Sequence, residues 1–238
     1  PGVFGKWCKP NYNSVVATFC HNISHGLPIQ VNDPSFELSL VYIDDVVEEF
    51  VKMIQGKRDS KKVPSVQPEY KIKLGDLANQ IKIFRESRDS LITEKVGSGL
   101  IRKLYSTYVS YLSPENFSYS IPAYTDERGI FAEMLKTQEN SQFSFFTIEP
   151  GLTRGGHYHH SKTEKFMVIK GTACFKFRHI ITNETYEIIT NDNQPTIMDT
   201  APGWSHNITN IGTSNLIAML WASEVFDKNH PDTIEYEV

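Results

Sequence analysis

The spacing of apolar residues changes near Phe117, and this change divides the chain into two differently built parts. Before it, apolar residues recur at helical spacing, as between Asn13 and His25 and again between Leu100 and Tyr108. After it, short apolar runs are separated by turn residues, which is typical of an all-β sandwich or barrel. The pattern predicts an α+β, multi-domain chain. A mostly helical domain with short strands (residues 1–114) precedes an all-β domain (residues 115–238).

Each part contains further segments of its own kind. Residues 38–43 form a short apolar run typical of a strand, and Asp44 is placed to cap the helix that follows and ends at Gly56. The charged stretch 57–68 holds two prolines and is expected to be a surface loop. Another amphipathic helix is predicted by the spacing of Leu74, Leu77, Ile81 and Phe84. The clearest expected strands of the all-β part are residues 143–148, 166–169, 172–179, 186–189 and 216–222.

The composition excludes several classes of protein. Of 238 residues, 24 are Lys or Arg and 28 are Asp or Glu, so we expect no basic surface for a nucleic acid. No apolar run approaches the roughly 18 residues of a membrane-spanning helix. The cysteines Cys8, Cys20 and Cys174 show no C-x-x-C spacing, which favours a cytoplasmic protein over a disulfide framework. The chain begins at Pro1 without a methionine, and we expect it to be a fragment.

Three histidines and one glutamate in the second part have the spacing of a metal-ligand set. His157 and His159 are two residues apart, so in an extended strand both side chains point to the same face. Glu164 can return on the next strand and His206 on a third. Three imidazoles and one carboxylate suit Zn²⁺, or another divalent transition metal such as Fe, Mn or Ni, better than Ca²⁺ or Mg²⁺. The alternative interpretation is a surface histidine cluster in a loop.

The two stretches that hold these residues resemble the paired motifs of the cupins. The first, residues 156–171, matches H-x-H, then Glu164, then Gly171 at the cupin spacing. The second, residues 202–210, places His206 and Asn210 as cupins do. It departs from the pattern in one respect, because Pro202 and Gly203 are adjacent where cupins separate them by one residue. The resemblance implies a jelly-roll barrel with a metal ion held by the four residues.

Two further elements resemble the 4-keto-sugar-nucleotide 3,5-epimerases, which are themselves cupins. One is the run from Tyr124 to Glu133, which reads D-x-R-G-x-F-x-E from Asp126 onward. The alternative for that run is a salt-bridged turn of little energetic value. The other element combines Gln138, Asn140 and Ser144 with the later R-G-x-H-Y of residues 154–158. The candidate pyrophosphate contacts are Arg128, Arg154 and Lys165, and for each the alternative is a solvent-facing charge.

The first part resembles the C-terminal half of an extended short-chain dehydrogenase/reductase. The resemblance is carried by residues 1–5, by the helix from Asn13 and by the V-Y-I-D-D-V run of residues 41–46. In that family this half supplies the sugar-nucleotide pocket, and Lys9, Tyr12 and Asn13 are the candidate contacts to a uracil or diphosphate. The family's glycine-rich turn and catalytic tyrosine and lysine are not in this sequence. Residues 1–112 alone are therefore not expected to bind NAD(P), and the alternative is a helical accessory domain.

Over its whole length the chain is similar to a family of bifunctional enzymes of capsular polysaccharide synthesis. The resemblance implies that the cupin epimerises C3 of a UDP-activated 4-keto-6-deoxy-N-acetylhexosamine. It also implies that the reductase half, complete only in a full-length enzyme, reduces C4 with NADPH to give a UDP-N-acetyl-6-deoxytalosamine. A homodimer is expected, since cupins often pair through their sheets.

The two cupin resemblances disagree about His157. In the metal-free epimerases this position is the base, whereas in the metal cupins it is a ligand whose lone pair is occupied. A metal ion on His157 therefore requires another base, and Tyr158, Glu133 and His160 are the candidates. Because side chains alternate along a strand, His160 should point away from the shared face of His157 and His159, which favours Tyr158 or Glu133.

Two other functions remain open from the sequence. One is a sugar-nucleotide 3,4-ketoisomerase, in which a neighbouring base carries the proton further. The other is a non-catalytic cupin that binds a metal or sugar as a regulator or scaffold.

Overall fold

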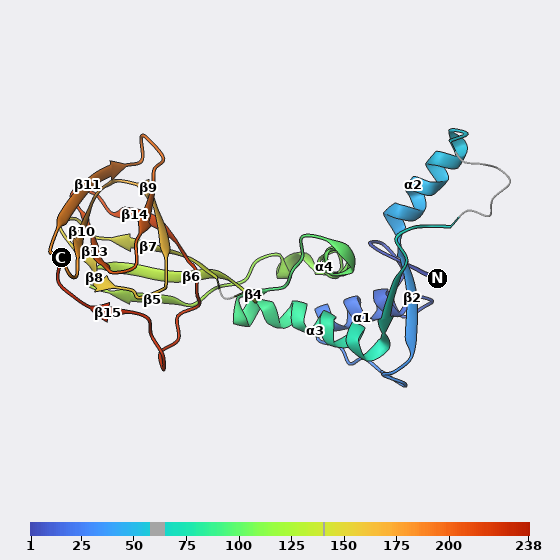
Figure 1. Cartoon of the computed structure of the whole chain (residues 1–238). Coiled ribbons are helices and arrows are strands. Elements are labelled where there is room, and N and C mark those ends of the chain that lie inside the picture. Colours follow the sequence, from blue (N-terminus) through green and yellow to red (C-terminus); the bar gives the residue numbers. More distant parts are fainter. Residues whose placement is uncertain (58–64, 140) are drawn as a thin grey trace. The chain divides into compact units, whose positions relative to one another are not determined.

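The computed structural model describes residues 1–57, 65–139 and 141–238, and the chain forms two compact units. They comprise Pro1–Tyr119 and Ser120–Val238 (Figure 1). Most of the expected loop at residues 57–68, and Asn140 of the epimerase-like element, lie outside the described residues. Among the described residues, no helix has the length and apolar character needed to cross a membrane.

The first unit combines a small sheet with a group of helices. Its sheet has the order β1-β2-β3, with β1 parallel and β3 antiparallel to β2. Helices α1, α3 and α4 share one core with this sheet, in which Phe19, Ile81 and Leu104 are buried. The elements of the unit are β1 (Gly2–Phe4), α1 (Val15–Ser24), β2 (Glu37–Tyr42), α2 (Ile43–Ile54), β3 (Tyr70–Lys73), α3 (Leu74–Ser90), β4 (Ile92–Thr93), α4 (Gly99–Val109) and the 3₁₀ turn η1 (Pro114–Asn116).

One expected helix cap in this unit is wrong. Helix α2 begins at Ile43 directly after β2, so Asp44 lies inside the first turn instead of capping it. Because no loop residue separates strand from helix, Tyr42 takes the cap position without a side-chain hydrogen bond. The Asp44 carboxylate accepts a hydrogen bond from Lys6 Nζ at 3.1 Å. By contrast, Ser14 caps α1 by accepting from the backbone N–H of Ala17 at 3.3 Å.

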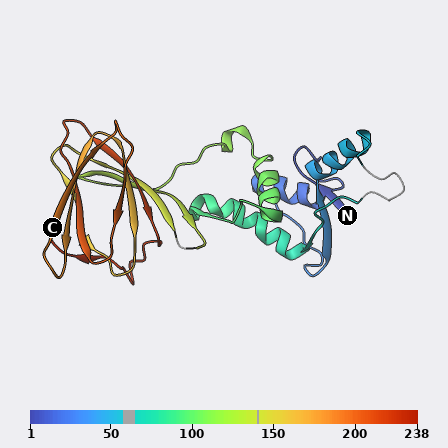
Figure 2. The ribbon, with the colours of Figure 1, turned by 45° about the horizontal axis from the view of Figure 1, so that its top comes forward.

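The second unit is built from two antiparallel sheets that face each other (Figures 1 and 2). One has the order β11-β10-β13-β8-β15, and the other runs β12-β9-β14-β7-β6 with β5 also paired to β6. This is the expected cupin-like architecture. The strands are β5 (Ala123–Asp126), β6 (Gly129–Thr137), β7 (Gln142–Ile148), β8 (Thr153–Tyr158), β9 (Glu164–Lys170), β10 (Thr172–His179), β11 (Thr185–Asn191), β12 (Ile197–Thr200), β13 (Trp204–Asn210), β14 (Leu216–Ala222) and β15 (Ile234–Glu235).

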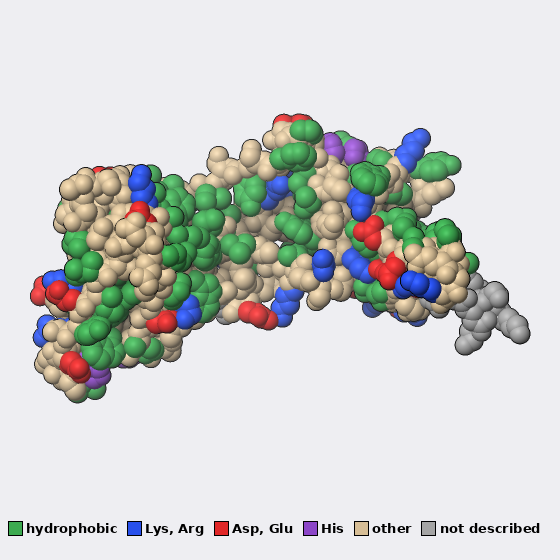
Figure 3. Space-filling model, turned by 90° about the horizontal axis from the view of Figure 1, so that it is seen from above, with side chains coloured by type: hydrophobic (Ala, Val, Ile, Leu, Met, Phe, Trp, Pro, Cys, Tyr) green, Lys and Arg blue, Asp and Glu red, His purple; other side chains and the backbone are tan. Residues whose placement is uncertain are grey.

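Alternation along the strands decides which side chains enter the space between the sheets. In β7, every second residue from Gln142 to Ile148 is buried, and the core of the unit includes Phe146, Phe166 and Phe175. On the outside, the face seen in Figure 3 shows Lys and Arg side chains beside Asp and Glu side chains on both units, without a run of one charge. Polar side chains that converge in the apolar interior of the second unit therefore indicate a functional site more clearly than the mixed charges on its surface do.

Candidate metal centre

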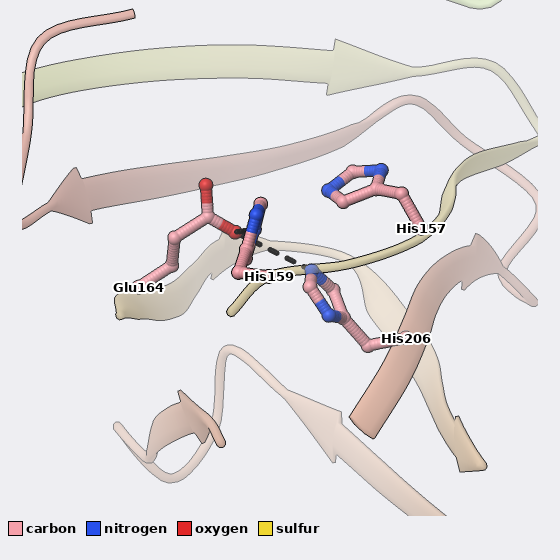
Figure 4. A group of neighbouring side chains, drawn as sticks. All are labelled: His157, His159, Glu164 and His206. Carbon is pink, nitrogen blue, oxygen red and sulfur yellow. Dashed lines mark ion pairs between the residues drawn. The ribbon is translucent and has the colours of Figure 1, made fainter. Parts of the chain in front are cut away.

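Four polar side chains converge between the two sheets of the second unit. His157 lies on β8, His159 follows in the loop to β9, Glu164 begins β9 and His206 lies on β13 (Figure 4). Each offers one ligand atom, and these atoms all lie within 4.8 Å of one another. The structure thus brings together the whole set that the sequence spacing selected, and it places that set in the interior instead of in a surface loop.

Three of the converging atoms are buried polar atoms that a cation would satisfy. Glu164 Oε2 lies 3.2 Å from His159 Nε2 and 3.3 Å from His206 Nε2. None of these three atoms has a hydrogen-bond partner in the described part of the chain. Burying a polar group without a partner is costly, so such groups are rare unless they serve a ligand. The residues present therefore fit a divalent transition-metal ion, and this cluster can bind one.

The second nitrogens of two histidines fix which nitrogen faces the cluster. His159 Nδ1 donates to the backbone carbonyl of Asp232, and His206 Nδ1 lies 3.4 Å from the carbonyl of Trp204. A carbonyl can only accept, so Nδ1 carries the hydrogen and Nε2 keeps a free lone pair. Metal-ligating histidines are commonly oriented by contacts of this kind.

The protonation states also suit metal binding. Burial, reinforced by neighbouring His206, lowers the pKa of His157 to about 4, so this imidazole is neutral near pH 7. Burial opposes ionisation of Glu164, but His159, His206 and the ammonium of Lys162 together hold its pKa below the ordinary value. Neutral imidazoles and an ionised carboxylate are the forms that ligate metal ions.

Lys162 is a member of the site that sequence reasoning missed. The residue is buried, and its Nζ lies 3.3 Å from Glu164 Oε1, the carboxylate oxygen that does not face the histidines. Its ammonium therefore holds one oxygen of Glu164 and leaves the other turned to the cluster. Lys162 lies in the loop before β9, where strand alternation does not apply, so its place between two motif positions carries no distinctive spacing.

A cavity of about 140 Å³ adjoins the cluster. His157, Glu164 and His206 line it together with Arg154. The rest of its wall is largely apolar, with Phe131, Phe146, Phe166, Phe175, Ile208 and Leu220 among the lining residues. A ligand in this cavity would meet the four-residue cluster, one guanidinium and several aromatic rings.

The three residues that were expected to contact phosphate differ in their surroundings. Arg154 lines the cavity and donates to Thr147 O and to Asp126 Oδ1, both at 3.2 Å. Arg128 forms a second ion pair with Asp126, at 2.5 Å, so the Asp126 carboxylate joins the two arginines. Lys165 lies on the outer face of β9, half exposed, and pairs with Asp199.

The three candidate bases also differ in the direction in which their side chains point. None of the three is among the residues that line the cavity. The rings of Tyr158 and His160 pack against each other with centroids 5.3 Å apart. Strand alternation explains this, because Tyr158 must face opposite to His157. Glu133 pairs across β6 and β7 with buried Ser144, which shares a face with cavity-lining Phe146. The Glu133 carboxylate forms an ion pair with Lys136 at 2.7 Å.

The nucleotide contacts expected in the first unit lie around a separate pocket. Tyr12 and Asn13 line a surface pocket of about 690 Å³ that also has Asn11, Asn22 and Gln30 on its wall. Lys9 lies outside that lining, with its Nζ 5.5 Å from the centroid of the Tyr12 ring. The pocket is rich in amide groups, which can hydrogen-bond a base or a sugar.

Known proteins resemble this chain in sequence. A family model described as the polysaccharide biosynthesis C-terminal domain matches residues 124–234. A UDP-2-acetamido-2,6-beta-L-arabino-hexul-4-ose reductase from Pseudomonas aeruginosa is 59% identical over 233 residues. That match covers 98% of this chain and 63% of the reductase.

Solved structures resemble it over its full length. The capsular polysaccharide assembling protein CapF from Staphylococcus aureus matches 100% of this chain at 41% identity with a TM-score of 0.96, and this chain covers 65% of it. A second crystal structure of CapF, in space group C2221, gives the same identity and TM-score with 70% of that chain covered. This chain therefore spans less than two thirds of the reductase and of the first CapF structure.

Proposed function

We propose a function that follows from the family of this chain. The chain belongs to the same family as the capsular polysaccharide assembling protein CapF. The proposal is that it acts in the cytoplasm as a sugar-nucleotide enzyme of capsular polysaccharide synthesis. Its all-β domain, residues 115–238, epimerises C3 of a UDP-4-keto-6-deoxy-N-acetylhexosamine. The observation that carries this proposal is the buried His and Glu cluster, which shares one cavity with Arg154. The 4-ulose in the name of the 59% identical reductase supports a 4-keto substrate.

The metal ion is proposed to be zinc, held by His157, His159, Glu164 and His206. Three imidazole nitrogens and one carboxylate oxygen form a donor set that zinc commonly takes. A bound zinc ion supplies Lewis-acid stabilisation for negative charge on the C4 oxygen. With His157 as a ligand, its lone pair is occupied and the residue is not the base.

Glu133 is the proposed base. The C4 ketone acidifies the C3 hydrogen, and the Glu133 carboxylate takes that proton while the C–H electron pair moves into an enolate. A proton from solvent water then adds to C3 on the opposite face of the sugar, the C4 ketone re-forms, and Glu133 releases its proton to the resulting hydroxide. Of the three candidates, Glu133 is the one on the cavity side of its strand, since its partner Ser144 shares a face with Phe146. Tyr158 and His160 pack against each other away from the cavity.

The positive charge for the diphosphate is proposed to come from Arg154 and Arg128. Both form an ion pair with the Asp126 carboxylate, which keeps the two guanidinium groups close to each other. Arginine suits this role because its planar donors match phosphate oxygens. Lys165 faces away from the cavity and has no part in this proposal.

The first domain, residues 1–114, is proposed to be the C-terminal, substrate-binding part of an extended short-chain reductase. The amide-rich pocket lined by Tyr12 and Asn13 supports a nucleotide or sugar ligand, with Lys9 beside Tyr12 as a third contact. In a full-length enzyme this domain would take part in NADPH-dependent reduction of C4. A homodimer is proposed as the working assembly.

The decisive experiment incubates the zinc-loaded chain with the UDP-4-keto sugar in heavy water. Mass spectrometry and NMR should show deuterium at C3 and inversion of that centre. A chelator should abolish the exchange, and Glu133→Gln should abolish it while zinc remains bound. A keto group found at C3 would identify a 3,4-ketoisomerase instead. Substrate binding without any exchange at C3 would make the domain a non-catalytic cupin and end the epimerase proposal.

A further inference from the structure

Residues 232–236, here called the C-terminal brace, reach the surroundings of all four candidate ligands. The brace includes β15, which pairs with β8 so that Glu235 lies opposite His157 and Ile234 opposite Tyr158. The backbone N–H of Tyr236 donates to Gly156 O at 3.0 Å, and Tyr236 O accepts from Ser205 Oγ at 2.5 Å. The strand that carries His157 and the residue before His206 are therefore both attached to the brace.

Asp232 holds the loop that carries His159. Its carboxylate accepts hydrogen bonds from the backbone N–H groups of His160, Ser161 and Lys162, each at 2.8 Å. It also accepts from Ser161 Oγ at 2.9 Å. The backbone carbonyl of the same residue accepts from His159 Nδ1. One residue thus fixes three successive backbone positions of the loop and the ring orientation of the histidine beside them.

The brace also reaches Glu164, through one intermediate side chain. Thr233 Oγ1 lies 3.4 Å from Lys162 Nζ, and the same ammonium lies 3.3 Å from Glu164 Oε1. The backbone N–H of Lys162 is one of the three bonded to the Asp232 carboxylate. Both ends of Lys162 are therefore held by the brace, and this lysine in turn holds the carboxylate.

We propose that Asp232 is a positioning residue for the metal centre and that the C-terminal brace sets the affinity of the site for its metal ion. This inference rests on the metal part of the proposed function. The ligand atoms come from three strands and a loop, so their convergence depends on what holds those elements together. Outer contacts that orient metal ligands typically change metal affinity about 10–100-fold when they are removed. Coupling is reciprocal, so a bound metal ion should in turn hold the brace in place.

The test compares Asp232→Asn with Asp227→Asn in the full chain. An asparagine keeps the shape of Asp232, but its amide nitrogen cannot accept hydrogen bonds. The hydrogen bonds to one of the two carboxylate oxygens are therefore lost. Asp227 is the matched control. It lies shortly before the brace, and its carboxylate accepts a hydrogen bond from the backbone N–H of Asn229, at 2.8 Å, within its own turn. Zinc affinity is measured by competition with a chromophoric chelator. The visible absorption of bound Co²⁺ reports the coordination geometry.

Asp232→Asn is expected to weaken zinc binding about 10–100-fold and to change the Co²⁺ spectrum, whereas Asp227→Asn should match the wild type. Zinc should slow amide hydrogen exchange at residues 160–162 in the wild type, and less so in Asp232→Asn. Should Asp232→Asn fail to fold, Ser161→Ala removes a single hydrogen bond to Asp232 and should show a smaller loss in the same direction.

Two results would overturn the inference, and they differ. A folded Asp232→Asn variant with wild-type zinc affinity and an unchanged Co²⁺ spectrum would reduce Asp232 to a structural cap, leaving the metal centre intact. A wild-type chain that binds no zinc would remove the metal centre itself, and the brace with it.

Discussion

His206 on β13 is the cross-strand partner of His157 on β8, and their ring centroids lie 4.7 Å apart. Immediately beyond this pair the strand register shifts between His206 and Asn207, which marks a β-bulge. Bulges re-aim side chains and are common beside functional sites. The close approach of the strands at this point depends on Gly155, where an added Cβ would lie 2.7 Å from His206 O.

Gly155→Ala is therefore expected to destabilise the protein and to displace His206. Gly155 has a φ of 104°, so a side chain meets both backbone strain, of about 1–2 kcal/mol, and a clash, of about 1–3 kcal/mol. Gly156→Ala is the matched control, since its φ of 81° carries strain but nothing lies within 4 Å of its added Cβ. Urea unfolding should show the larger loss for Gly155→Ala, and only that variant should bind zinc less tightly. Equal losses would mean that the close contact is unimportant.

His206→Ala is expected to remove most of the bound zinc, because it deletes one of four ligands and opens the interior of the cluster. Elemental analysis of the dialysed protein measures the occupancy. His160→Ala serves as the control, since this exposed histidine packs against Tyr158 outside the cavity. If the two variants kept the same amount of zinc, the ligand set would have to be reassigned.

Lys162→Met should destabilise the metal-free protein more than the zinc-bound protein. Removing one partner of a buried ion pair leaves the other charge uncompensated, which costs about 3–5 kcal/mol. A zinc ion would supply positive charge to Glu164, so zinc should raise the melting temperature more in this variant than in the wild type. Lys165→Met breaks an exposed pair instead and should cost about 0–1 kcal/mol. Equal melting temperatures for the two metal-free variants would contradict the role given to Lys162.

Asp126 is expected to make folding stability depend on acid pH. The hydrogen bond from Arg128, with help from Arg154, lowers the pKa of this carboxyl from 3.8 to about 2. The folded state therefore binds fewer protons here than the unfolded state, so the contribution is present above pH 4 and is lost as the pH falls towards 2. Urea midpoints of the wild type and Asp126→Asn should converge over that interval. A difference that stays constant with pH would show that Asp126 acts through shape alone.

Sequence patterns predicted the elements of the all-β part well, because alternation and turn residues are local signals. The expected strands at residues 172–179 and 216–222 coincide with β10 and β14. The convergence of His157, His159, Glu164 and His206 was also predicted, because the cupin-like motifs carry their spacing, while their role as ligands stays a prediction.

Features that depend on distant contacts were not visible in the sequence. Nothing local links Asp232 to the loop it caps, and no periodicity shows that Lys162 is buried beside Glu164. In α2 the apolar spacing predicted a helix, and the helix is there. Yet Val47, Phe50 and Ile54 remain exposed, because periodicity reports an apolar face without reporting what covers it. Tyr158 illustrates a signal that was present but unused, since alternation alone turns it away from His157.

The span of the Asp232 contacts also bears on the order of folding. Its hydrogen bonds to the loop join residues 70 to 72 positions apart in the chain. Contacts of such long range form slowly, because the chain between them must lose its freedom first. A refolding chain would thus pair strands that are close in sequence, such as β10 and β11, before it holds a finished ligand set. Zinc capture during refolding should therefore lag behind the first rise of the far-ultraviolet β-sheet signal, so that metal binding reports a late step of folding.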